Sequence, residues 1–217
     1  SLDAEVKNRD PRFSQQIATR GFDFLNGDII ALPRIGTSVT STGYQPIKGR
    51  SSSIAAWNAN ASTYDFFIFR YAETLLIEAE AKAELGQINQ SILDNTINKL
   101  RDRVAMPHLM MNVAIDPRLA AKYPAVTGPF QNLILEIRRE RRIELGSDGF
   151  RFDDLHRWKA GNVISNPETI LGVKLLPSVR AEYPPTQVAG IVVDANDYIR
   201  VYPNITSRTW SDKMYLF

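Results

Sequence analysis

The stretch Ile134–Gly161, ILEIRRERRIELGSDGFRFDDLHRWKAG, decides the fold of this chain. It predicts two charged helices joined by a Gly-Ser-Asp-Gly turn, because apolar residues recur at three- and four-residue steps on one face of the first helix. A second row at i,i+4 spacing is acidic and consists of Glu136, Glu140 and Glu144. Arg residues on the neighbouring row lie within reach of these acids. We therefore favour an internal network of ion pairs as the interpretation of this stretch.

The charge balance argues against a nucleic-acid surface. Residues 134–159 hold seven Arg or Lys and six Asp or Glu, whereas a phosphate-binding surface carries a clear basic excess. The whole chain of 217 residues has a formal net charge of only +2. We expect no nucleic-acid partner.

The same carboxylates are poor candidates for catalysis. Asp153 and Asp154 are adjacent, so on a helix their side chains point about 100° apart. Glu140 and Glu144 share a face, but each has Arg within one turn, which favours the ionised form over the proton donor that a general acid must be. Glycosidase carboxylates converge from separate elements across a cleft, and a sequence does not display such convergence. We expect no catalytic residues and keep a glycoside hydrolase as the weaker alternative.

The composition excludes further kinds of site. There is no cysteine, which removes disulfides, thiolate metal sites and cysteine nucleophiles. His108 and His156 are the only histidines and lie in unrelated contexts, so we expect neither a metal site nor a metal cofactor. No apolar run approaches the length of a membrane span.

Three segments are expected along residues 1–217. Residues 1–65 read as loop-rich, residues 66–161 as a helical scaffold, and residues 162–217 as loops with short strands. The fold class that this organisation predicts is mainly α, with helix hairpins, long irregular loops and a few short β-strands.

The helical scaffold begins with a predicted pair of helices. The first covers Phe66–Leu85 and ends at Gly86, a natural C-terminal cap. The second covers Ser91–Val104, and the short connection between the two predicts an antiparallel hairpin. The remaining expected elements are a loop over Met106–Gly128, helices over Pro129–Leu145 and Arg151–Lys159, and strands over Ile191–Val193 and Tyr198–Tyr202.

Several motifs follow one another in a fixed order. They are RDPR at Arg9–Arg12, RYAETLLIEAEAKAELG at Arg70–Gly86, INKLRDRV at Ile97–Val104, ERRIEL at Glu140–Leu145, and DGFR, DDL and RW at Asp148–Arg151, Asp153–Leu155 and Arg157–Trp158. In this order they resemble the SusD/RagB family, whose last motif usually has Glu where this chain has Asp148. The resemblance covers about residues 9–161, and it identifies the chain as a C-terminal portion of such a protein, because family members are normally longer, with an N-terminal lipoprotein cysteine and further tetratricopeptide-like helix pairs.

The resemblance implies a function and a place. Family members are non-enzymatic, surface-exposed outer-membrane lipoproteins of Bacteroidetes-type bacteria, involved in starch and polysaccharide utilization and nutrient uptake. They capture glycans, or in some members peptides, for delivery to a partner TonB-dependent (SusC-like) transporter. On this view the helix hairpins are tetratricopeptide-like. A protein-interaction module of that kind without a small ligand remains the main alternative.

The resemblance also gives the charged stretch a role as scaffold. We expect its guanidinium groups to tie turns and helix ends together by ion pairs. The residues assigned to this ion-pair motif are Glu140, Arg141, Arg142, Glu144, Asp148, Arg151, Asp154 and Arg157. Trp158 is expected to plug the core beside them.

Ligand binding is expected in the loops instead. Sugar rings stack on aromatic side chains while nearby amides and guanidinium groups bind their hydroxyls, and loops present such groups without disturbing helix packing. The segment Tyr44–Tyr64 interleaves these residue types, and Trp210 with Tyr198 and Tyr202 forms a second set. The candidate ligand-binding residues are Tyr44, Arg50, Trp57, Asn58, Tyr64 and Trp210. Ordinary half-buried aromatic packing is the alternative for each aromatic residue.

Overall fold

The protein is mainly helical, as its sequence predicts. The structure, a computed structural model, describes residues 2–23, 29, 35, 40–63, 65, 67–205 and 208–211, and within them the strands form a single two-stranded sheet. The chain divides into two compact units, of which the first comprises residues 1–66 and 164–209 and the second residues 67–163 and 210–217.

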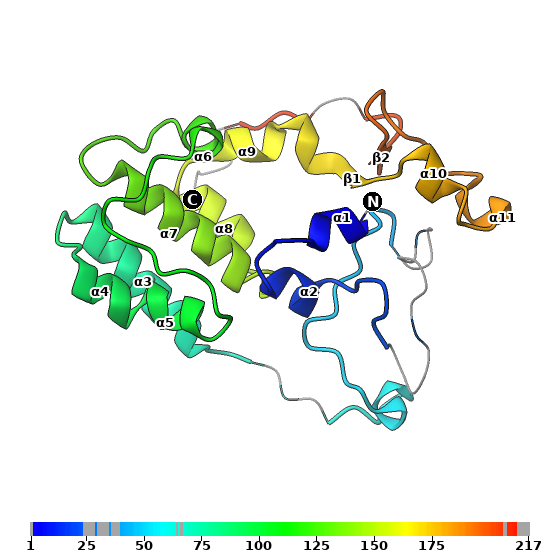
Figure 1. The fold of residues 1–217 in the computed structure, drawn as a ribbon, viewed down its shortest axis with the longest axis horizontal. Helices are drawn as coiled ribbons and strands as arrows, with labels where there is room; N and C mark the ends of the chain where they lie inside the picture. Colours follow the sequence, from blue (N-terminus) through cyan, green and yellow to red (C-terminus); the bar gives the residue numbers. More distant parts are fainter. Residues whose placement is uncertain are drawn as a thin grey trace. The chain divides into compact units, whose positions relative to one another are not determined.

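The second unit holds the helices that the motifs predict (Figure 1). Its principal buried apolar side chains come from four helices and include Leu76, Ala79, Leu93, Ile97, Leu133 and Ile137. The helices are α3 (Tyr71–Glu84), α4 (Gln90–Asn95), α5 (Ile97–Asp102), α6 (Pro117–Lys122), α7 (Gln131–Glu144) and α8 (Arg151–Arg157), followed by α9 (Gly161–Ser165).

Helices α3 and α7 pack against each other in opposite directions. Arg70, just before α3, pairs with Glu144 at the end of α7. A Cβ atom placed on Gly86, just after α3, would lie 3.6 Å from Cε2 of Phe130, just before α7. Arg103, just after α5, also pairs with Glu144. Since α5 therefore ends where α3 begins, these two helices are antiparallel, as their short connection predicts.

Helix α3 starts later than predicted, at Tyr71 rather than Phe66. Phe66 itself lies outside the described residues, while Phe67, Ile68 and Phe69 are exposed and not helical. The helix does not extend back through these residues, because Arg70 adopts an extended conformation (φ −123°, ψ 135°). The predicted end is confirmed: Gly86 has φ +69°, and the N–H of Gln87 donates to the carbonyl of Lys82 at 2.8 Å.

The helix predicted over Ser91–Val104 is two helices, α4 and α5. They are separated at Thr96, whose backbone departs from helical geometry (φ −124°, ψ −89°) and whose hydroxyl donates to the carbonyl of Ile92 at 2.6 Å. Threonine hydroxyls compete in this way with backbone hydrogen bonds. Just beyond the break, the buried side chain of Asn98 binds the backbone of Leu109 in both directions, at 2.7 Å and 3.2 Å.

The prediction of an uninterrupted loop over Met106–Gly128 was wrong, because α6 lies within it. Asp116 caps this helix by accepting hydrogen bonds from the backbone N–H groups of Arg118 (2.7 Å) and Leu119 (3.3 Å). Pro117 occupies the first helical position, where its missing N–H costs nothing. The Asp116-Pro117 pair thus begins a helix here, rather than only interrupting the chain as a loop would.

The first unit combines short elements around one two-stranded sheet. Prolines that the sequence presents as breaks begin three of its helices, since proline is favoured at a first helical position. The elements are α1 (Leu2–Val6), α2 (Arg12–Gln16), η1 (Ile54–Trp57), η2 (Pro167–Ile170), β1 (Leu171–Lys174), α10 (Pro177–Arg180), α11 (Pro185–Val188) and β2 (Tyr198–Arg200).

The sheet pairs β1 with β2 in antiparallel register, with Leu171 opposite Arg200. Strand β1 was not predicted, and the strand predicted over Ile191–Val193 is reduced to an isolated bridge between Val193 and Ile199. Buried residues around the sheet include Ile35, Val173, Leu175, Tyr183, Val188 and Ile199. Within the described part of the chain, no helix combines the length and the apolar character that crossing a membrane would require.

Candidate functional site

The buried carboxylates of α7 bind Arg residues from other elements. Glu144, which is 2% exposed, accepts from Arg70 Nη2 at 2.8 Å on one oxygen and from Arg103 Nη2 at 2.6 Å on the other. Arg70 also bridges to Asp148 in the turn after α7. A single carboxylate therefore joins the start of α3 to the ends of α5 and α7.

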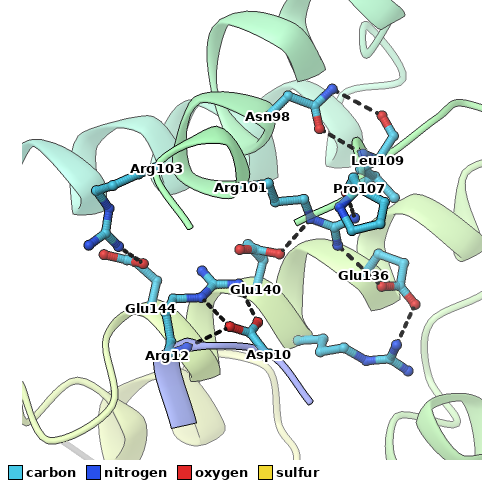
Figure 2. A network of polar contacts seen from close by, with 11 residues as sticks. Asp10, Arg12, Asn98, Arg101, Arg103, Pro107, Leu109, Glu136, Glu140 and Glu144 are labelled. Atoms are coloured by element: carbon cyan, nitrogen blue, oxygen red, sulfur yellow. Dashed lines mark hydrogen bonds and ion pairs between the residues drawn. The ribbon is translucent and has the colours of Figure 1, made fainter. Parts of the chain in front are cut away.

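Arg101 of α5 binds the two carboxylates that precede Glu144 on α7, those of Glu140 and Glu136 (Figure 2). Its Nε donates to Glu140 at 2.9 Å, a second nitrogen lies 3.7 Å from Glu136, and a third donates to the carbonyl of Pro107 at 3.2 Å. Burial raises the pKa of Glu136 despite the neighbouring Arg139 and Arg101. These acids hold α5 and the loop after it against α7.

A second buried group ties α8 to α3. Asp154 accepts from Nε of Arg141 at 2.8 Å and from Arg157 at 2.9 Å. Glu80 receives two hydrogen bonds from Arg157, at 2.5 Å and 2.6 Å, and one from the indole N–H of Trp158 at 2.5 Å. Burial alone would raise the pKa of Glu80, but these hydrogen bonds outweigh it and bring that pKa below its usual value.

Two members of the predicted ion-pair motif behave differently from the rest. Arg142 is exposed and forms no ion pair with any residue that the structure describes. Arg151 donates instead to the hydroxyl of Tyr123, at 3.0 Å. Both depart from the expected pairing because the motif's acids are already bound, mostly by Arg residues of other helices.

Sequence reasoning missed those other partners: Arg70, Arg101 and Arg103. Pairs at i,i+4 spacing can be read from a helix, but partners that the fold brings together cannot. A signal was nevertheless present, since all three lie within the quoted motifs RYAE and INKLRDRV. Each motif supplies cations that the acids of α7 need.

The early RDPR motif forms a closed turn within the first unit. Arg12 donates to Asp10 through its backbone N–H (2.9 Å), its Nε (3.0 Å) and one Nη (2.6 Å). The side chain of Arg12 is buried, and Arg12 is the first residue of α2. The carboxylate thus fixes both the backbone of the turn and the side chain that follows it.

The loop candidates centre on Trp57, at the end of η1. Its indole N–H donates to the carbonyl of Ser51 at 3.1 Å, and the guanidinium of Arg50 lies 4.0 Å from the centroid of its ring. The side chain of Trp57 nevertheless remains 47% exposed. Asn58, the next residue, is exposed as well. The structure therefore brings three of the predicted binding residues together in one short loop.

Tyr44 lies in different surroundings. Its hydroxyl donates to Glu5 at 2.8 Å, and its ring meets that of Phe13 edge to face at 6.3 Å. Burial, reinforced by the hydrogen bond to Glu5, raises the pKa of Tyr44. These contacts fit the alternative of half-buried packing. Tyr64 lies outside the described residues.

Trp210 belongs to the second unit and joins an aromatic cluster there. Its ring meets His156 at 4.9 Å and Phe152 at 6.4 Å, both edge to face. It also packs so closely on Gly161 that a Cβ atom there would lie 2.0 Å from the indole. Tyr198 and Tyr202, its companions in the second candidate set, belong to the first unit and are exposed. Trp210 is thus held chiefly by packing.

No group of three or more His, Asp or Glu side chains among the described residues is placed to hold a metal ion. The buried acids are instead occupied by guanidinium groups, as above. What the geometry offers chemically is a rigid helical scaffold and an exposed aromatic-cationic loop.

Comparison with known proteins agrees with the motifs. The model of the SusD family matches residues 3–214. The chain is 30% identical over 118 residues to SusD-like protein P2 of Formosa agariphila, covering 54% of this chain and 22% of that protein. SusD-like protein P38 of the same organism is 31% identical over 134 residues, covering 60% of this chain and 24% of that protein.

Solved structures give the same fold. A SusD-like carbohydrate binding protein from Bacteroides fragilis, 28% identical, superposes with a TM-score of 0.61 over 90% of this chain and 37% of its own. A second SusD-like protein of that organism, 24% identical, has a TM-score of 0.56 over 98% of this chain and 36% of its own. The chain spans less than a quarter of the curated relatives that it matches. Because the family model matches nearly all of its length, the chain belongs to the SusD family.

Proposed function

We propose that this chain is part of a non-enzymatic protein that captures glycans at the cell surface. The observation that carries the proposal is the family match over residues 3–214. The relative from Bacteroides fragilis that shares 28% identity is described as carbohydrate binding. We further propose that the chain forms the C-terminal portion of the family fold, because its motifs follow the family order from Arg9 onward.

The captured glycan would pass to a partner TonB-dependent (SusC-like) outer-membrane transporter. The protein would then be a surface-exposed lipoprotein of the outer membrane, acting in polysaccharide utilization. Both points rest on the family resemblance, and the organisms of the similar proteins, Formosa and Bacteroides, are compatible with them.

Glycan capture is assigned to the loop around Trp57. An exposed indole offers the apolar face on which a sugar ring stacks, and the neighbouring Arg50 and Asn58 supply hydrogen-bond donors for hydroxyl groups. A loop can present these groups while the helices of the second unit stay intact.

The absence of catalysis is proposed on the state of the acids. Glu140 and Glu144 are both buried, and Arg side chains of other elements occupy their carboxylate oxygens, so in the described part of the chain neither carboxyl group faces a cleft where a substrate could bind. A hydrolase would release products from a polysaccharide, and it would lose that activity on Glu140→Gln.

A protein-interaction function without small ligand has one observation in its favour. Phe67, Ile68 and Phe69 are consecutive, apolar and exposed, with Phe69 at 87%. Contiguous apolar surface of this kind marks interaction sites. Recovery of a protein partner together with failure to bind any saccharide would favour this second candidate.

The proposal is tested with Trp57→Ala on a glycan array. We expect loss of binding to the captured glycan by about tenfold or more, since stacking on an aromatic ring contributes on the order of 1–2 kcal/mol. Ile54→Ala is the matched control, because Ile54 is exposed on the same helical turn but has no ring. Unchanged glycan binding by Trp57→Ala would remove this site, and the same samples assayed for product release would detect a hydrolase.

A further inference from the structure

Arg side chains of α7 and α8 gather around two aromatic rings in the second unit. Tyr123, just after α6, meets Trp158, just after α8, edge to face at 5.7 Å. The guanidinium of Arg138 lies 5.3 Å from the centroid of the Tyr123 ring, and Arg142 follows one turn later on the same row of α7. Arg151, the first residue of α8, donates to the hydroxyl of Tyr123 at 3.0 Å and lies 5.9 Å from the centroid of the Trp158 ring. Tyr123 thus links the Arg row of α7 to the start of α8.

Two of these three guanidinium groups have no carboxylate partner among the described residues. Arg138 pairs with Glu84 at 3.3 Å. The side chain of Arg142 forms neither an ion pair nor a hydrogen bond with any described residue, and Arg151 has only the neutral hydroxyl of Tyr123 as acceptor there. Most other Arg side chains described in this unit bind Asp or Glu. The pair Arg142 and Arg151 is therefore a local excess of two positive charges.

The surroundings of the pair make this excess costly. Nη1 of Arg151 is buried and has no hydrogen-bond partner among the described residues, and a buried donor left in that state costs free energy. Burial lowers the pKa of Arg142, and the positive charge of Arg151 lowers that pKa further. The side chain of Arg142 is nevertheless exposed over much of its area, so solvent and dissolved ions reach it. An anion bound between the two guanidinium groups would reduce both costs.

We propose that Arg142 and Arg151 form a binding site for a doubly charged oxyanion, sulfate or phosphate, either dissolved or carried as an ester on a ligand. A dianion matches the two formal charges, and a planar guanidinium presents parallel N–H groups to the oxygens of such an ion. Arg142 supplies the exposed donors, while Arg151 supplies the second charge and its unpartnered donor. The site is independent of glycan capture at Trp57, which lies in the other unit.

The test is calorimetric titration of the full chain with sodium sulfate and sodium phosphate at neutral pH. Chloride keeps the ionic strength constant, so that a general screening of surface charge is the same at every point. We expect saturable binding of both ions. Acetate carries a single charge, and we expect it to bind about tenfold more weakly or not at all.

Arg142→Gln is the decisive variant, because the exposed side chain can be changed without altering the core. We expect it to weaken sulfate binding by about tenfold or more, the effect of one charge-assisted pair. Arg118→Gln is the matched control: Arg118 is exposed on α6, has no ion pair among the described residues, and should change the Kd by no more than about twofold. Equal losses in the two variants would indicate a general attraction and overturn the site.

Arg151→Gln tests the second half of the pair. We expect a loss similar to that of Arg142→Gln, and thermal unfolding checks that the variant remains folded without the contact to Trp158. Full sulfate binding by folded Arg151→Gln would overturn the pairing. So would a folded wild type that binds neither sulfate nor phosphate in a saturable way.

Sulfate and phosphate esters distinguish the two sources of the anion. Galactose 6-sulfate or glucose 6-phosphate binding more tightly than the inorganic ion would support a site for an anionic group on a larger ligand. Tighter binding of the inorganic ion would support a site for a dissolved anion. Trp57→Ala should leave the binding of inorganic sulfate unchanged, so that failure of this site and failure of glycan capture give different results.

Discussion

Arg141 and Arg142 are neighbours on α7, but the first side chain is buried and the second is exposed. Arg141 is buried, donates to both oxygens of Asp154 at 2.8 Å and lies 3.7 Å from Glu73. Arg142 is exposed and forms no ion pair with any residue that the structure describes. The sequence assigns both residues to one ion-pair motif. Spacing along a helix shows which residues share a face of that helix, but it does not show whether that face is buried in the core or exposed to solvent.

This contrast gives a prediction at a single helical turn. We expect Arg141→Ala to lower the free energy of unfolding by about 3 kcal/mol, since it leaves buried Asp154 with Arg157 as its remaining partner. Arg142→Ala should change it by no more than about 0.5 kcal/mol, the usual range for an exposed side chain. Urea unfolding followed by circular dichroism measures both. Equal losses would mean that Arg142 has a structural partner.

Among the elements, helices with a full apolar face were the most predictable. Helix α7 begins and ends within two residues of Pro129–Leu145, because its apolar steps and the glycine after it are local signals. The break at Thr96 was not predictable in this way, since it depends on a hydroxyl whose alternative acceptor, the carbonyl of Ile92, is equally available in a continuous helix. Strand β1 depends on pairing with β2, about 27 residues later, which no local pattern reveals.

The turn over residues 42–44 packs on β1, and Gly43 offers a test of that packing. Val173 donates to the carbonyl of Thr42 at 2.7 Å, and a Cβ atom on Gly43 would lie 2.3 Å from Cγ1 of Val173. Gly43 also has φ +79°. We expect Gly43→Ala to destabilise the protein by about 2–4 kcal/mol, the sum of backbone strain and overpacking.

Gly21→Ala separates the cost of backbone strain from the cost of overpacking. Gly21 has nearly the same φ, +83°, but a Cβ atom there meets nothing within 4 Å. Its substitution should cost only the backbone term, about 1 kcal/mol. Thermal unfolding of the two variants gives the difference, and equal shifts in the melting temperature would show that Val173 moves aside without penalty.

For the whole molecule, the sequence predicted the kind of scaffold better than the candidate site. Motif order and charge balance both follow from residues near one another in the chain, and they point to an ion-paired helical core. The grouping of Tyr44 with Trp57 followed from the same local reasoning. Tyr44 instead contacts Glu5 and Phe13, which lie 39 and 31 residues earlier in the sequence. Stacking of Arg50 on Trp57 is likewise a property of the folded loop.

The buried acids also govern how the stability of the molecule depends on pH. Glu80 is 6% exposed and has a pKa lowered by its bonds to Arg157 and Trp158, against the opposing effect of burial. A carboxyl whose pKa is lower in the folded state contributes stability above its unfolded pKa of about 4.5, and that contribution is lost as the pH falls through the folded pKa. Glu136, whose pKa burial raises, has the opposite dependence: its contribution is present below the unfolded pKa and is lost as the pH rises through the folded one.

Glu80→Gln and Glu136→Gln therefore form a matched pair with opposite signs. Urea unfolding between about pH 7 and about pH 3 measures the difference in unfolding free energy between wild type and each variant. For Glu80→Gln we expect a loss of stability that is largest near neutral pH and shrinks below about pH 4.5, because protonation then removes the ion pair from the wild type as well. For Glu136→Gln the stability of the variant relative to wild type should instead rise as the pH increases, since the buried charge that burial disfavours is gone. Parallel plots of unfolding free energy against pH for wild type and Glu80→Gln would contradict this prediction. They would show that Arg157 and Trp158 bind the neutral and ionised forms of Glu80 equally well, and that the contact between α3 and α8 is stabilised by packing rather than by charge.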